Sequence, residues 1–368
     1  MDRVPKIMHV VISMVVGGAE RLVYDMVRYP EFADNPPIVC CMDSLGDLGQ
    51  KLQAEGYKVY CKGRKQGFDF EMIAWLRAII KVEQVEVVHA HQYSPLVYAT
   101  PAAFLAGRKK VVYTEHGRFY PDRKSWKRTL INPLLALGVD HLVSISAATA
   151  EAMATYDNFP RKRIQVIHNG INCTAMNPDF DIVAKKRDLA LDDKSHIIGT
   201  AARLNSIKNI PMMLRGFKLV LQFHPDCCLV IAGQGEEEEQ LKIMAFDLGI
   251  AEKVKFIGLR FDLPEIYQMF DVFLLTSFSE GISVTLLESM ASRVPSVVTD
   301  VGGNGEVTQD GITGYLVTCD NDDHLAQRIN ELLHNPALAK KMGAAAQKRV
   351  NETFSVVNMM NNYMQMYR

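Results

Sequence analysis

Short apolar stretches alternate with longer amphipathic stretches along the whole chain. In the first half, the apolar stretches that favour β-strands are Ile7–Ile12, Ile38–Met42, Tyr57–Cys61, Val85–Ala90, Val111–Thr114, His141–Ile145 and Gln165–Ile167. Helical periodicity fills most of the intervals, as in Ala19–Arg28, Phe70–Val82 and Arg128–Leu137. Strands that alternate with helices in this way predict a parallel sheet that is covered by helices on both faces.

The same pattern starts again in the second half. Its strand candidates are Ile197–Ala201, Leu229–Ala232, Val254–Ile257, Val272–Leu275, Ser296–Thr299 and Gly314–Val317. The segment 168–178 between the halves is rich in turn formers and is predicted to be a hinge. We therefore expect an α/β fold with two doubly wound Rossmann-like domains, 1–171 and 172–351, that face each other across a cleft. Ligands of such sheets bind beyond the carboxyl ends of the strands.

Composition and charge narrow the function classes. The chain has 368 residues and a formal net charge of −1, so no overall basic field indicates nucleic acid as a partner. Its seven cysteines show no zinc-type spacing, and an odd count without a disulfide framework favours a reducing cytosol. The first residues lack a signal-peptide pattern, and no apolar stretch is long enough to span a membrane. We expect a cytoplasmic protein.

Two cations follow the first strand of the second half. Arg203 and Lys208 come directly after Ile197–Ala201, and Asn209 is predicted to be the N-cap of the next helix, with Pro211 in its first turn. Cations and a helix N-terminus at the carboxyl end of a strand suit a diphosphate. A pair of ordinary surface cations would show the same spacing.

Two glutamates frame the start of a later helix. Glu280 is expected in the loop before it, Ser283 at its N-cap, and Glu288 more than one turn inside it. The backbone N–H groups near Gly281 and Ile282 could meet a ligand, and the two carboxylates could accept hydrogen bonds from sugar and ribose hydroxyls. A helix-start charge and a partly buried glutamate are the structural alternative.

Glycines and histidines supply weaker candidates in the first half. Gly17 and Gly18 follow the first strand and would let the backbone approach a ligand closely, although a plain tight turn is the alternative. His116 ends a strand and could bind a sugar hydroxyl or serve the structure alone. His89 and His91 share one face of a strand. No third metal ligand with matching spacing is evident, so we expect no metal.

The motifs occur in an order that is specific as a set. They are Val16-Gly-Gly-Ala-Glu-Arg21, Thr114-Glu-His-Gly117, Ile167-His-Asn-Gly-Ile171, Arg203-Leu-Asn-Ser-Ile-Lys-Asn209, Ala232-Gly-Gln-Gly235, Ser279 through Ala291, and Asp300-Val-Gly-Gly-Asn304. Together they resemble glycosyltransferase family 4, the retaining enzymes of the GT-B fold. The resemblance spans nearly the whole chain, and Glu280 and Glu288 match the E-x7-E motif of that family.

The resemblance implies a role for each matching residue of the second domain. Arg203 and Lys208 would neutralise the donor diphosphate as it leaves. Glu280 would hold the transferred sugar, and Glu288 would hold the ribose hydroxyls.

Further roles follow from the same resemblance. Gly18 would donate a backbone N–H to phosphate, His116 would contact the donor sugar, and Gly258 and Arg260 would lie near the nucleobase. The C-terminal helix, residues 352–368, would cross back onto the first domain.

The implied function is transfer of a sugar, with retention, from a nucleotide diphosphate sugar to a glycan or lipid-linked acceptor, in cell-surface polysaccharide or glycolipid synthesis. No cofactor is implied, because fixed cations replace a divalent metal. Ile282 and Ser283 stand where the family often has Phe-Gly, which leaves the donor sugar open. The alternatives are a nucleotide-sugar 2-epimerase on the same fold and a non-catalytic two-lobed binding protein.

A basic and aromatic segment gives an expectation for the acceptor side. Residues 118–128 hold five cations and three aromatic residues, among them Trp126. Such a segment could contact an anionic bilayer at the inner membrane face, or grip a lipid diphosphate or a charged glycan. An ordinary solvated loop whose aromatic residues pack on the domain is the alternative.

Overall fold

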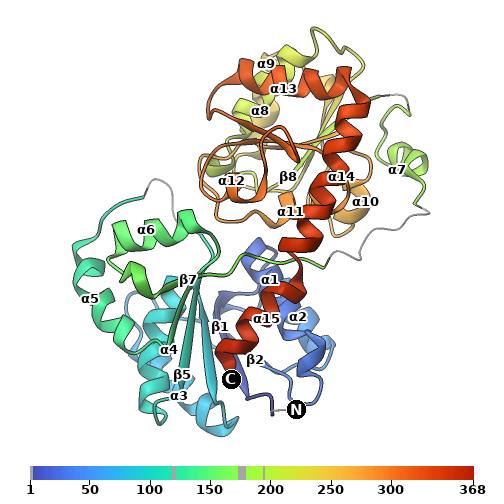
Figure 1. The fold of residues 1–368 in the computed structure, drawn as a ribbon. Coiled ribbons are helices and arrows are strands. Elements are labelled where there is room, and N and C mark those ends of the chain that lie inside the picture. Colours follow the sequence, from blue (N-terminus) through green and yellow to red (C-terminus); the bar gives the residue numbers. More distant parts are fainter. Residues whose placement is uncertain (1–2, 118–121, 173–179, 194) are drawn as a thin grey trace. The chain divides into compact units, whose positions relative to one another are not determined.

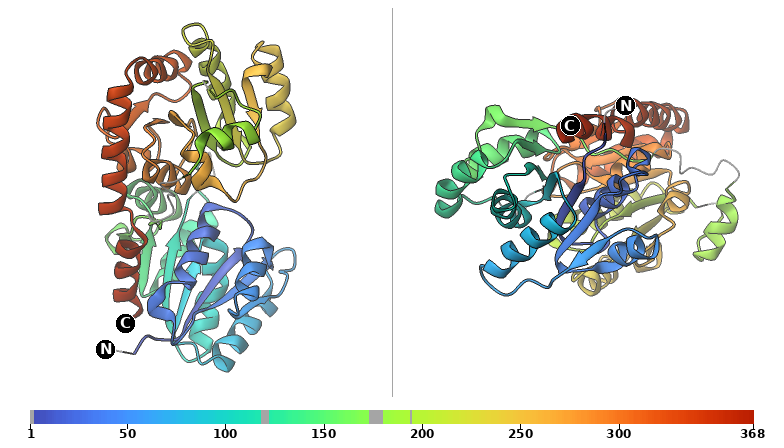
Figure 2. Two further views of the ribbon diagram at one scale, coloured as in Figure 1. Left: turned by 90° about the vertical axis from the view of Figure 1, so that its right-hand side faces the viewer. Right: turned by 90° about the horizontal axis from the view of Figure 1, so that it is seen from below.

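The computed structural model describes residues 3–117, 122–172, 180–193 and 195–368 (Figure 1). The chain divides into two compact units. Unit 1 consists of Met1–Gly170 and Val356–Arg368, and unit 2 consists of Ile171–Ser355. Each unit contains one parallel sheet with helices on both faces (Figures 1 and 2). The predicted class of two doubly wound α/β domains is therefore confirmed.

Unit 1 is built on a seven-stranded sheet in the order β3-β2-β1-β4-β5-β6-β7. The strands are β1 (Ile7–Ser13), β2 (Ile38–Ser44), β3 (Val59–Cys61), β4 (Val87–His91), β5 (Lys110–Glu115), β6 (His141–Ser144) and β7 (Ile164–Val166). The longer helices are α1 (Gly18–Val27), α2 (Gly46–Ala54), α3 (Phe70–Val82), α4 (Tyr93–Leu105), α5 (Trp126–Leu137), α6 (Ala147–Asp157) and α15 (Val356–Tyr367).

Unit 2 is built on a six-stranded sheet in the order β10-β9-β8-β11-β12-β13. The strands are β8 (Ile197–Ala201), β9 (Cys228–Ala232), β10 (Val254–Phe256), β11 (Val272–Leu275), β12 (Ser296–Thr299) and β13 (Gly314–Val317). The helices are α7 (Ile182–Asp188), α8 (Ile210–Val220), α9 (Glu238–Asp247), α10 (Leu263–Tyr267), α11 (Val284–Ala291), α12 (Asn304–Val307), α13 (Asp322–His334) and α14 (Pro336–Thr353).

Every predicted strand is present, with ends shifted by two residues at most. The central strands read as continuous apolar stretches because both of their faces are covered, and β4, β8, β9, β11 and β12 are buried along their whole length. In each sheet the strand order reverses once, between β1 and β4 in unit 1 and between β8 and β11 in unit 2. Loops that leave adjacent strands in opposite directions open a crevice at such points, where ligands bind.

The last helix of the chain packs on the sheet of unit 1. Met360, Tyr363 and Tyr367 of α15 are buried. The Tyr367 hydroxyl lies 2.7 Å from Nδ1 of His89, and the Tyr363 hydroxyl lies 3.0 Å from Oγ1 of Thr114. These bonds join α15 to β4 and β5, so the C-terminal residues complete the first unit rather than extend the second.

Candidate active site

The reversal point of unit 2 brings a predicted cation and a predicted carboxylate together. Lys208 follows β8, Glu280 follows β11, and these two strands are neighbours. The Lys208 Nζ donates to Glu280 Oε1 at 2.6 Å, and the Ser277 hydroxyl donates to the same oxygen at 2.6 Å. The Glu280 side chain is only 8% exposed. A carboxylate this deep needs such partners, because an unpaired charge is costly to bury.

Arg203 lies at the same edge of the sheet, but its side chain differs from that of Lys208 in exposure and in partners. Its side chain is exposed, and it makes no hydrogen bond or ion pair with any residue that the structure describes. Its loop is held firmly, since Leu204 N–H donates to the Gln234 carbonyl at 3.0 Å. Gly233 has a φ of +131°, and a Cβ on it would lie 1.9 Å from the Ala202 carbonyl oxygen. The Ala232–Gly235 motif therefore supports the loop that presents Arg203.

The helix start after Lys208 differs in one respect from the expectation. Asn209 occupies the N-cap position of α8, and Pro211 lies in the first turn, as predicted. The Asn209 side chain makes no capping bond, however, and donates instead to Asp320 at 2.9 Å. An N-cap side chain reaches the helix from extended backbone, whereas Asn209 has left-handed backbone with φ of 46°. The backbone N–H groups of this first turn thus receive no side-chain cap from Asn209.

The loop between Glu280 and α11 is clamped by a second pair of glycines. A Cβ on Gly302 would lie 1.9 Å from the Glu280 carbonyl oxygen, and one on Gly303 would lie 1.9 Å from that of Gly281. Gly303 N–H also donates to the Glu280 carbonyl at 3.2 Å. The side chain of Ile282 is buried, so only its backbone is available to a ligand. This close backbone packing fixes the position of the loop segment that carries Glu280.

The helix after this loop begins as predicted. Ser283 is the N-cap of α11, and its hydroxyl accepts a hydrogen bond from Leu286 N–H at 3.4 Å. Glu288 lies more than one turn inside the helix and is half-buried. The hydroxyl of Tyr267, at the end of α10, donates to Glu288 Oε2 at 3.0 Å. Tyr267 is fully buried, and burial raises its pKa well above the usual value, so it remains a donor.

Sequence reasoning missed Tyr267, because it lies 21 residues before Glu288 and no motif marks it. A buried tyrosine near the end of a short helix normally has a partner for its hydroxyl, which is the one feature that could have revealed it.

Gly258 and Arg260 lie in the loop after β10. Gly258 has a left-handed φ of 67°, and its carbonyl accepts from Gly233 N–H at 2.8 Å. Arg260 binds Asp262 with two bonds, Nε to Oδ1 at 2.8 Å and Nη2 to Oδ2 at 2.6 Å. Hydrogen bonds from Arg260 hold the pKa of Asp262 far below its usual range. The guanidinium is thus already committed to a carboxylate, and a nucleobase would have to share it.

In unit 1 the glycine pair opens a helix. Gly17 is the N-cap of α1, its carbonyl accepts from Arg21 N–H at 2.9 Å, and the helix starts at Gly18, one residue earlier than predicted. Gly17 has extended backbone with φ of −165°, which any residue adopts. As a glycine, Gly17 offers no side chain that could cap this helix start. An anion is favoured at such a helix N-terminus.

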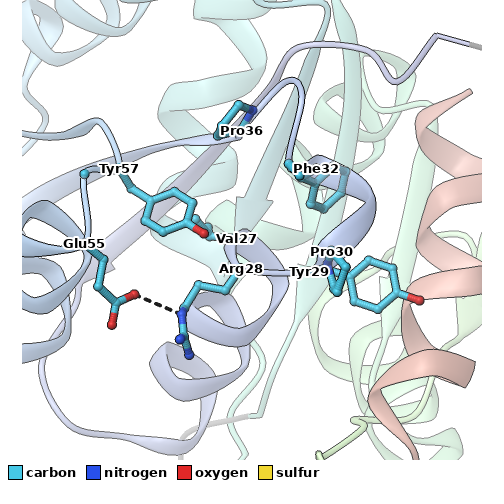
Figure 3. A pocket seen from close by; sticks show the side chains of 10 residues that line it. Val27, Arg28, Tyr29, Pro30, Phe32, Pro36, Glu55 and Tyr57 are labelled. Carbon is cyan, nitrogen blue, oxygen red and sulfur yellow. Dashed lines mark ion pairs between the residues drawn. The ribbon is translucent and has the colours of Figure 1, made fainter.

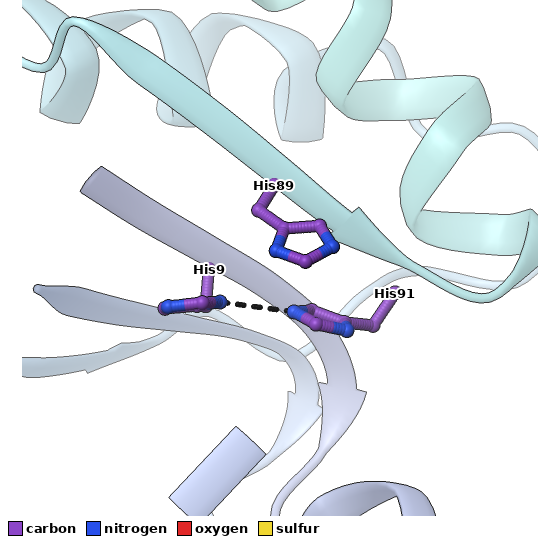
Figure 4. A group of neighbouring side chains, drawn as sticks. All are labelled: His9, His89 and His91. Atoms are coloured by element: carbon purple, nitrogen blue, oxygen red, sulfur yellow. Dashed lines mark hydrogen bonds between the residues drawn. The ribbon is translucent and has the colours of Figure 1, made fainter. Parts of the chain in front are cut away.

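His116 belongs to a group of histidines at the reversal point of unit 1. It follows β5 directly, and its Nε2 lies 2.8 Å from Nδ1 of His91. The other ring nitrogen of His91 lies 2.9 Å from Nδ1 of His9, on β1 (Figure 4). Burial lowers the pKa of His116 to about 4 and that of His9 to about 3. These rings are neutral at pH 7.

The expectation that no third ligand lies near His89 and His91 is wrong. Among the described residues, His9, His89 and His91 place one ring nitrogen each within 4.8 Å of one another. His9 escaped notice because it lies on β1, and only the β1–β4 register aligns it with His89. Both nitrogens of His89 are engaged, with Tyr367 at 2.7 Å and Thr114 at 2.8 Å. An ion would have to break such bonds, so the arrangement fits a hydrogen-bonded core better than a metal centre.

Comparison with known proteins decides the family. Residues 16–175 match the family described as Glycosyltransferase Family 4, and residues 181–349 match the one described as Glycosyl transferases group 1. EpsD of Bacillus subtilis (strain 168), a protein named as a glycosyltransferase, is 30% identical over 317 residues that cover 82% of this chain and 82% of EpsD. The chain belongs to glycosyltransferase family 4.

Other relatives of this family 4 glycosyltransferase match over nearly their full length. The UDP-Gal:alpha-D-GlcNAc-diphosphoundecaprenol alpha-1,3-galactosyltransferase of Escherichia coli is 24% identical, with 98% of this chain and 96% of that protein covered. The crystal structure of Anabaena HepE in complex with UDP-glucose has a TM-score of 0.86 at 22% identity, covering 98% of both chains. The fold is thus that of the GT-B glycosyltransferases.

A surface hollow of about 290 Å³ lies in unit 1, away from the residues described above. It is lined by residues of the segments 27–36 and 55–57 and is bordered by the Arg28–Glu55 ion pair at 2.9 Å (Figure 3). No predicted site residue lines it. Within the described ranges, no helix combines the length and apolar character needed to cross a membrane.

Proposed function

We propose that this glycosyltransferase moves a sugar from a nucleotide diphosphate donor, with retention of anomeric configuration and without a metal ion, to a glycan or lipid-linked acceptor. The observation that carries the proposal is the charged cluster at the reversal point of unit 2. There Arg203 is an exposed cation, and Lys208 is bound to the buried carboxylate of Glu280. Such a cluster suits a reaction in which negative charge grows on a leaving diphosphate.

The chemistry follows from the charges. As the glycosidic bond breaks, the anomeric carbon becomes oxocarbenium-like and the bonding electrons move to the diphosphate. Fixed cations stabilise that charge more in the transition state than in the ground state. In the site without ligand, Lys208 donates a hydrogen bond to Glu280. When the donor binds, this bond breaks, so that Lys208 binds the diphosphate and Glu280 accepts a hydrogen bond from a sugar hydroxyl. The acceptor attacks from the face that the diphosphate leaves, and a phosphate oxygen takes the acceptor proton.

The remaining roles rest on the family resemblance and on local geometry. Glu288, held by Tyr267, binds the ribose hydroxyls. Gly17 and Gly18 open α1 toward a phosphate, and His116 contacts the transferred sugar. HepE, which was crystallised with UDP-glucose, supports a nucleotide sugar as the donor.

Two relatives favour a lipid-linked acceptor in cell-surface glycan synthesis. The name of the Escherichia coli galactosyltransferase describes an acceptor that is a diphosphoundecaprenol-linked sugar. A mannosyltransferase of Mycolicibacterium smegmatis is named for a phosphatidylinositol monomannoside acceptor and is 28% identical over 287 residues. Both acceptors carry phosphate on a lipid, so an acceptor of this chemistry is our first choice.

The test is a panel of nucleotide sugars in a thermal-shift assay, followed by turnover with and without a lipid diphosphate sugar. A donor that binds only the folded protein raises the melting temperature. The proposal expects one donor to stabilise the protein and to be consumed when the acceptor is added. Release of a free epimer without any acceptor would identify a 2-epimerase instead. Stabilisation by no nucleotide sugar would contradict the proposal.

We also propose that α5 places unit 1 against the anionic inner face of a membrane. The basic segment 118–128 is described only from residue 122 onward. The described part shows Trp126 to be 71% exposed, which contradicts the alternative that this aromatic residue packs on the domain. Along α5 the exposed apolar side chains continue at helical spacing through Leu130, Leu134 and Leu137. No acidic residue occurs between residues 123 and 137.

An exposed apolar stripe beside cations is the pattern of a helix that lies in a membrane interface. Arg123, Lys124 and Lys127 are exposed and can meet anionic headgroups. Arg128 cannot serve in the same way, because it binds the buried carboxylate of Asp157 at 3.1 Å. It also lies 4.5 Å from the ring centre of Tyr93. Arg128 therefore attaches α5 to the domain.

Liposome co-sedimentation tests this surface. The variant carries Ser at Arg123, Lys124 and Lys127, and each lost cation should cost about 1 kcal/mol of binding, or about a hundredfold in partition for the three. The matched control carries Ser at three exposed lysines of α14 in unit 2, Lys340, Lys341 and Lys348. Wild type and control should bind anionic vesicles, and the α5 variant should not. Equal binding by all three proteins, or none by wild type, would refute the membrane role.

A further inference from the structure

Three histidines of unit 1 form one continuous hydrogen-bonded chain. His9 Nδ1 lies 2.9 Å from His91 Nε2, and His91 Nδ1 lies 2.8 Å from His116 Nε2 (Figure 4 shows the first of these bonds). The rings of His9 and His91 are stacked with centroids 5.2 Å apart, and those of His91 and His116 with centroids 5.1 Å apart. His91 therefore uses both of its ring nitrogens inside the chain.

The two ends of the chain are alike in one respect. Nε2 of His9 and Nδ1 of His116 are both buried atoms that find no hydrogen-bond partner among the described residues. They differ in their surroundings, because His9 is completely buried in the sheet, whereas His116 is partly exposed in the loop that follows β5. The His116 end is the one at which a ligand can supply the missing partner.

Burial fixes the number of protons in the chain. It lowers the pKa of His9 to about 3, that of His116 to about 4, and that of His91 well below its usual value. Each ring is therefore neutral at pH 7 and carries one proton, on either Nδ1 or Nε2.

The geometry then couples the three tautomers. If His9 carries its proton on Nδ1, it donates to Nε2 of His91, which must carry its own proton on Nδ1. That proton is donated to Nε2 of His116, whose proton must also lie on Nδ1. In the reverse direction all three rings carry the proton on Nε2. A mixed arrangement would place two protons, or none, in one of the 2.8 or 2.9 Å contacts.

We propose that His91 and His9 are positioning residues that hold His116 in the Nδ1–H tautomer, so that this N–H donates to an oxygen of the donor sugar. The Nδ1–H direction leaves the surplus N–H on His116, where a ligand oxygen can accept it. The opposite direction would leave the surplus N–H on His9, deep in the sheet. Buried N–H groups without an acceptor are rare in folded proteins. This inference rests on the sugar contact that we assign to His116.

His89 provides an internal control for the chain. It lies on the same strand as His91, and their ring centroids are 4.0 Å apart. Its hydrogen bonds run to Tyr367 and Thr114 instead, away from His116. A variant at His89 thus disturbs the same core without cutting the chain.

The test is nitrogen NMR of protein labelled with 15N-histidine, in which long-range proton–nitrogen correlations distinguish Nδ1–H from Nε2–H rings. For wild type at pH 7.5 we expect the Nδ1–H pattern in His9, His91 and His116. His91→Asn keeps an amide that can donate to His116 and should keep its tautomer. His91→Leu removes that partner and should give a mixture of both forms. His89→Gln should leave His116 unchanged.

Kinetics provide the second readout. Loss of the defined tautomer should lower kcat/KM about tenfold in His91→Leu, the effect of one hydrogen bond, and His91→Asn should restore most of it. An Nε2–H form of His116 in wild type, or a single Nδ1–H form that survives in His91→Leu, would overturn the inference. The spectrum of the wild-type protein shows the tautomers directly. The inference can therefore be refuted even if a variant fails to fold. If the spectra agree but no nucleotide sugar is turned over, the proposed function fails and the coupling stands.

Discussion

The two sheets reverse their strand order at equivalent points, but the side chains that gather there differ in kind. At β1 and β4 of unit 1 the side chains are neutral histidines without a charged partner inside the chain of rings. At β8 and β11 of unit 2 they form the Lys208–Glu280 ion pair, and Arg203 is exposed in the loop that follows β8. The same topology thus gathers neutral ring nitrogens in one unit and opposite charges in the other.

The comparison shows how burial determines the kind of interaction that each group of side chains can make with a ligand. In unit 1 desolvation keeps the rings uncharged, so recognition must rely on the direction of hydrogen bonds. In unit 2 the Lys208 side chain is 22% exposed, so it can exchange one anionic partner for another. Four predictions test this contrast.

The largest effect should be acid destabilisation of unit 1. His9, His89, His91 and His116 all have a lowered pKa in the folded state, so below about pH 6.5 the unfolded chain binds more protons. Stability is complete above that pH and falls toward pH 4, by about 1.4 kcal/mol per pH unit for each histidine.

Urea unfolding between pH 7.5 and 5 measures this effect through tryptophan fluorescence, because Trp75 and Trp126 both lie in unit 1. His9→Phe should reduce the slope by about one proton. His334→Gln in unit 2 is the control, because His334 is exposed and lies outside this group of four histidines. A pH-independent midpoint would show that the histidines are not held neutral.

The next largest effect concerns the exposed cation. Arg203→Ala should lower turnover by about tenfold to a thousandfold, the scale for losing one group that stabilises transition-state charge. The melting temperature should not change, since the side chain contacts no described residue through a hydrogen bond or ion pair. Steady-state kinetics with a saturating donor provide the measurement. Arg187→Ala in α7 of unit 2, also an exposed arginine, is the control and should keep full turnover.

The Lys208–Glu280 pair should show a smaller effect, on stability as well as on turnover. Lys208→Ala leaves the carboxylate of Glu280 without its cation and should cost about 1–3 kcal/mol of unfolding free energy. Lys208→Ala combined with Glu280→Ala should recover part of this loss while turnover stays low. A double-mutant cycle in urea measures the coupling. Strictly additive losses would show that the pair contributes nothing to the resting site.

The smallest effect should come from Tyr267→Phe. This substitution removes the hydroxyl that donates to Glu288 and changes little else in the core. The KM for the donor should rise about threefold to tenfold, the effect of one neutral-to-charged hydrogen bond, with kcat nearly unchanged. An unchanged KM would show that Glu288 does not contribute to binding of the donor.

The sequence predicts the strands well, because strands buried on both faces are continuous apolar stretches between turns. It also points to Arg203, Lys208 and Glu280 through their positions after strands, and to Glu288 through its spacing from Glu280. It does not predict that Lys208 binds Glu280, because 72 residues separate them and only the pairing of β8 with β11 brings them together.

The histidine chain was missed for the same physical reason. His9 and His91 lie 82 positions apart, and no local spacing connects them. Only the strand order of a doubly wound sheet, which puts β1 beside β4, aligns the two rings. Contacts between side chains on neighbouring parallel strands depend on the strand order. A local pattern in the sequence does not predict that order.

The most direct test of the central claim is sugar transfer in excess chelator, with the anomeric configuration of the first product followed by proton NMR. Our proposal assigns Arg203 and Lys208 to neutralise the diphosphate with fixed positive charge, and it therefore predicts full turnover in the chelator and a product with the configuration of the donor. Loss of activity that manganese restores, or a product of inverted configuration, would contradict the account.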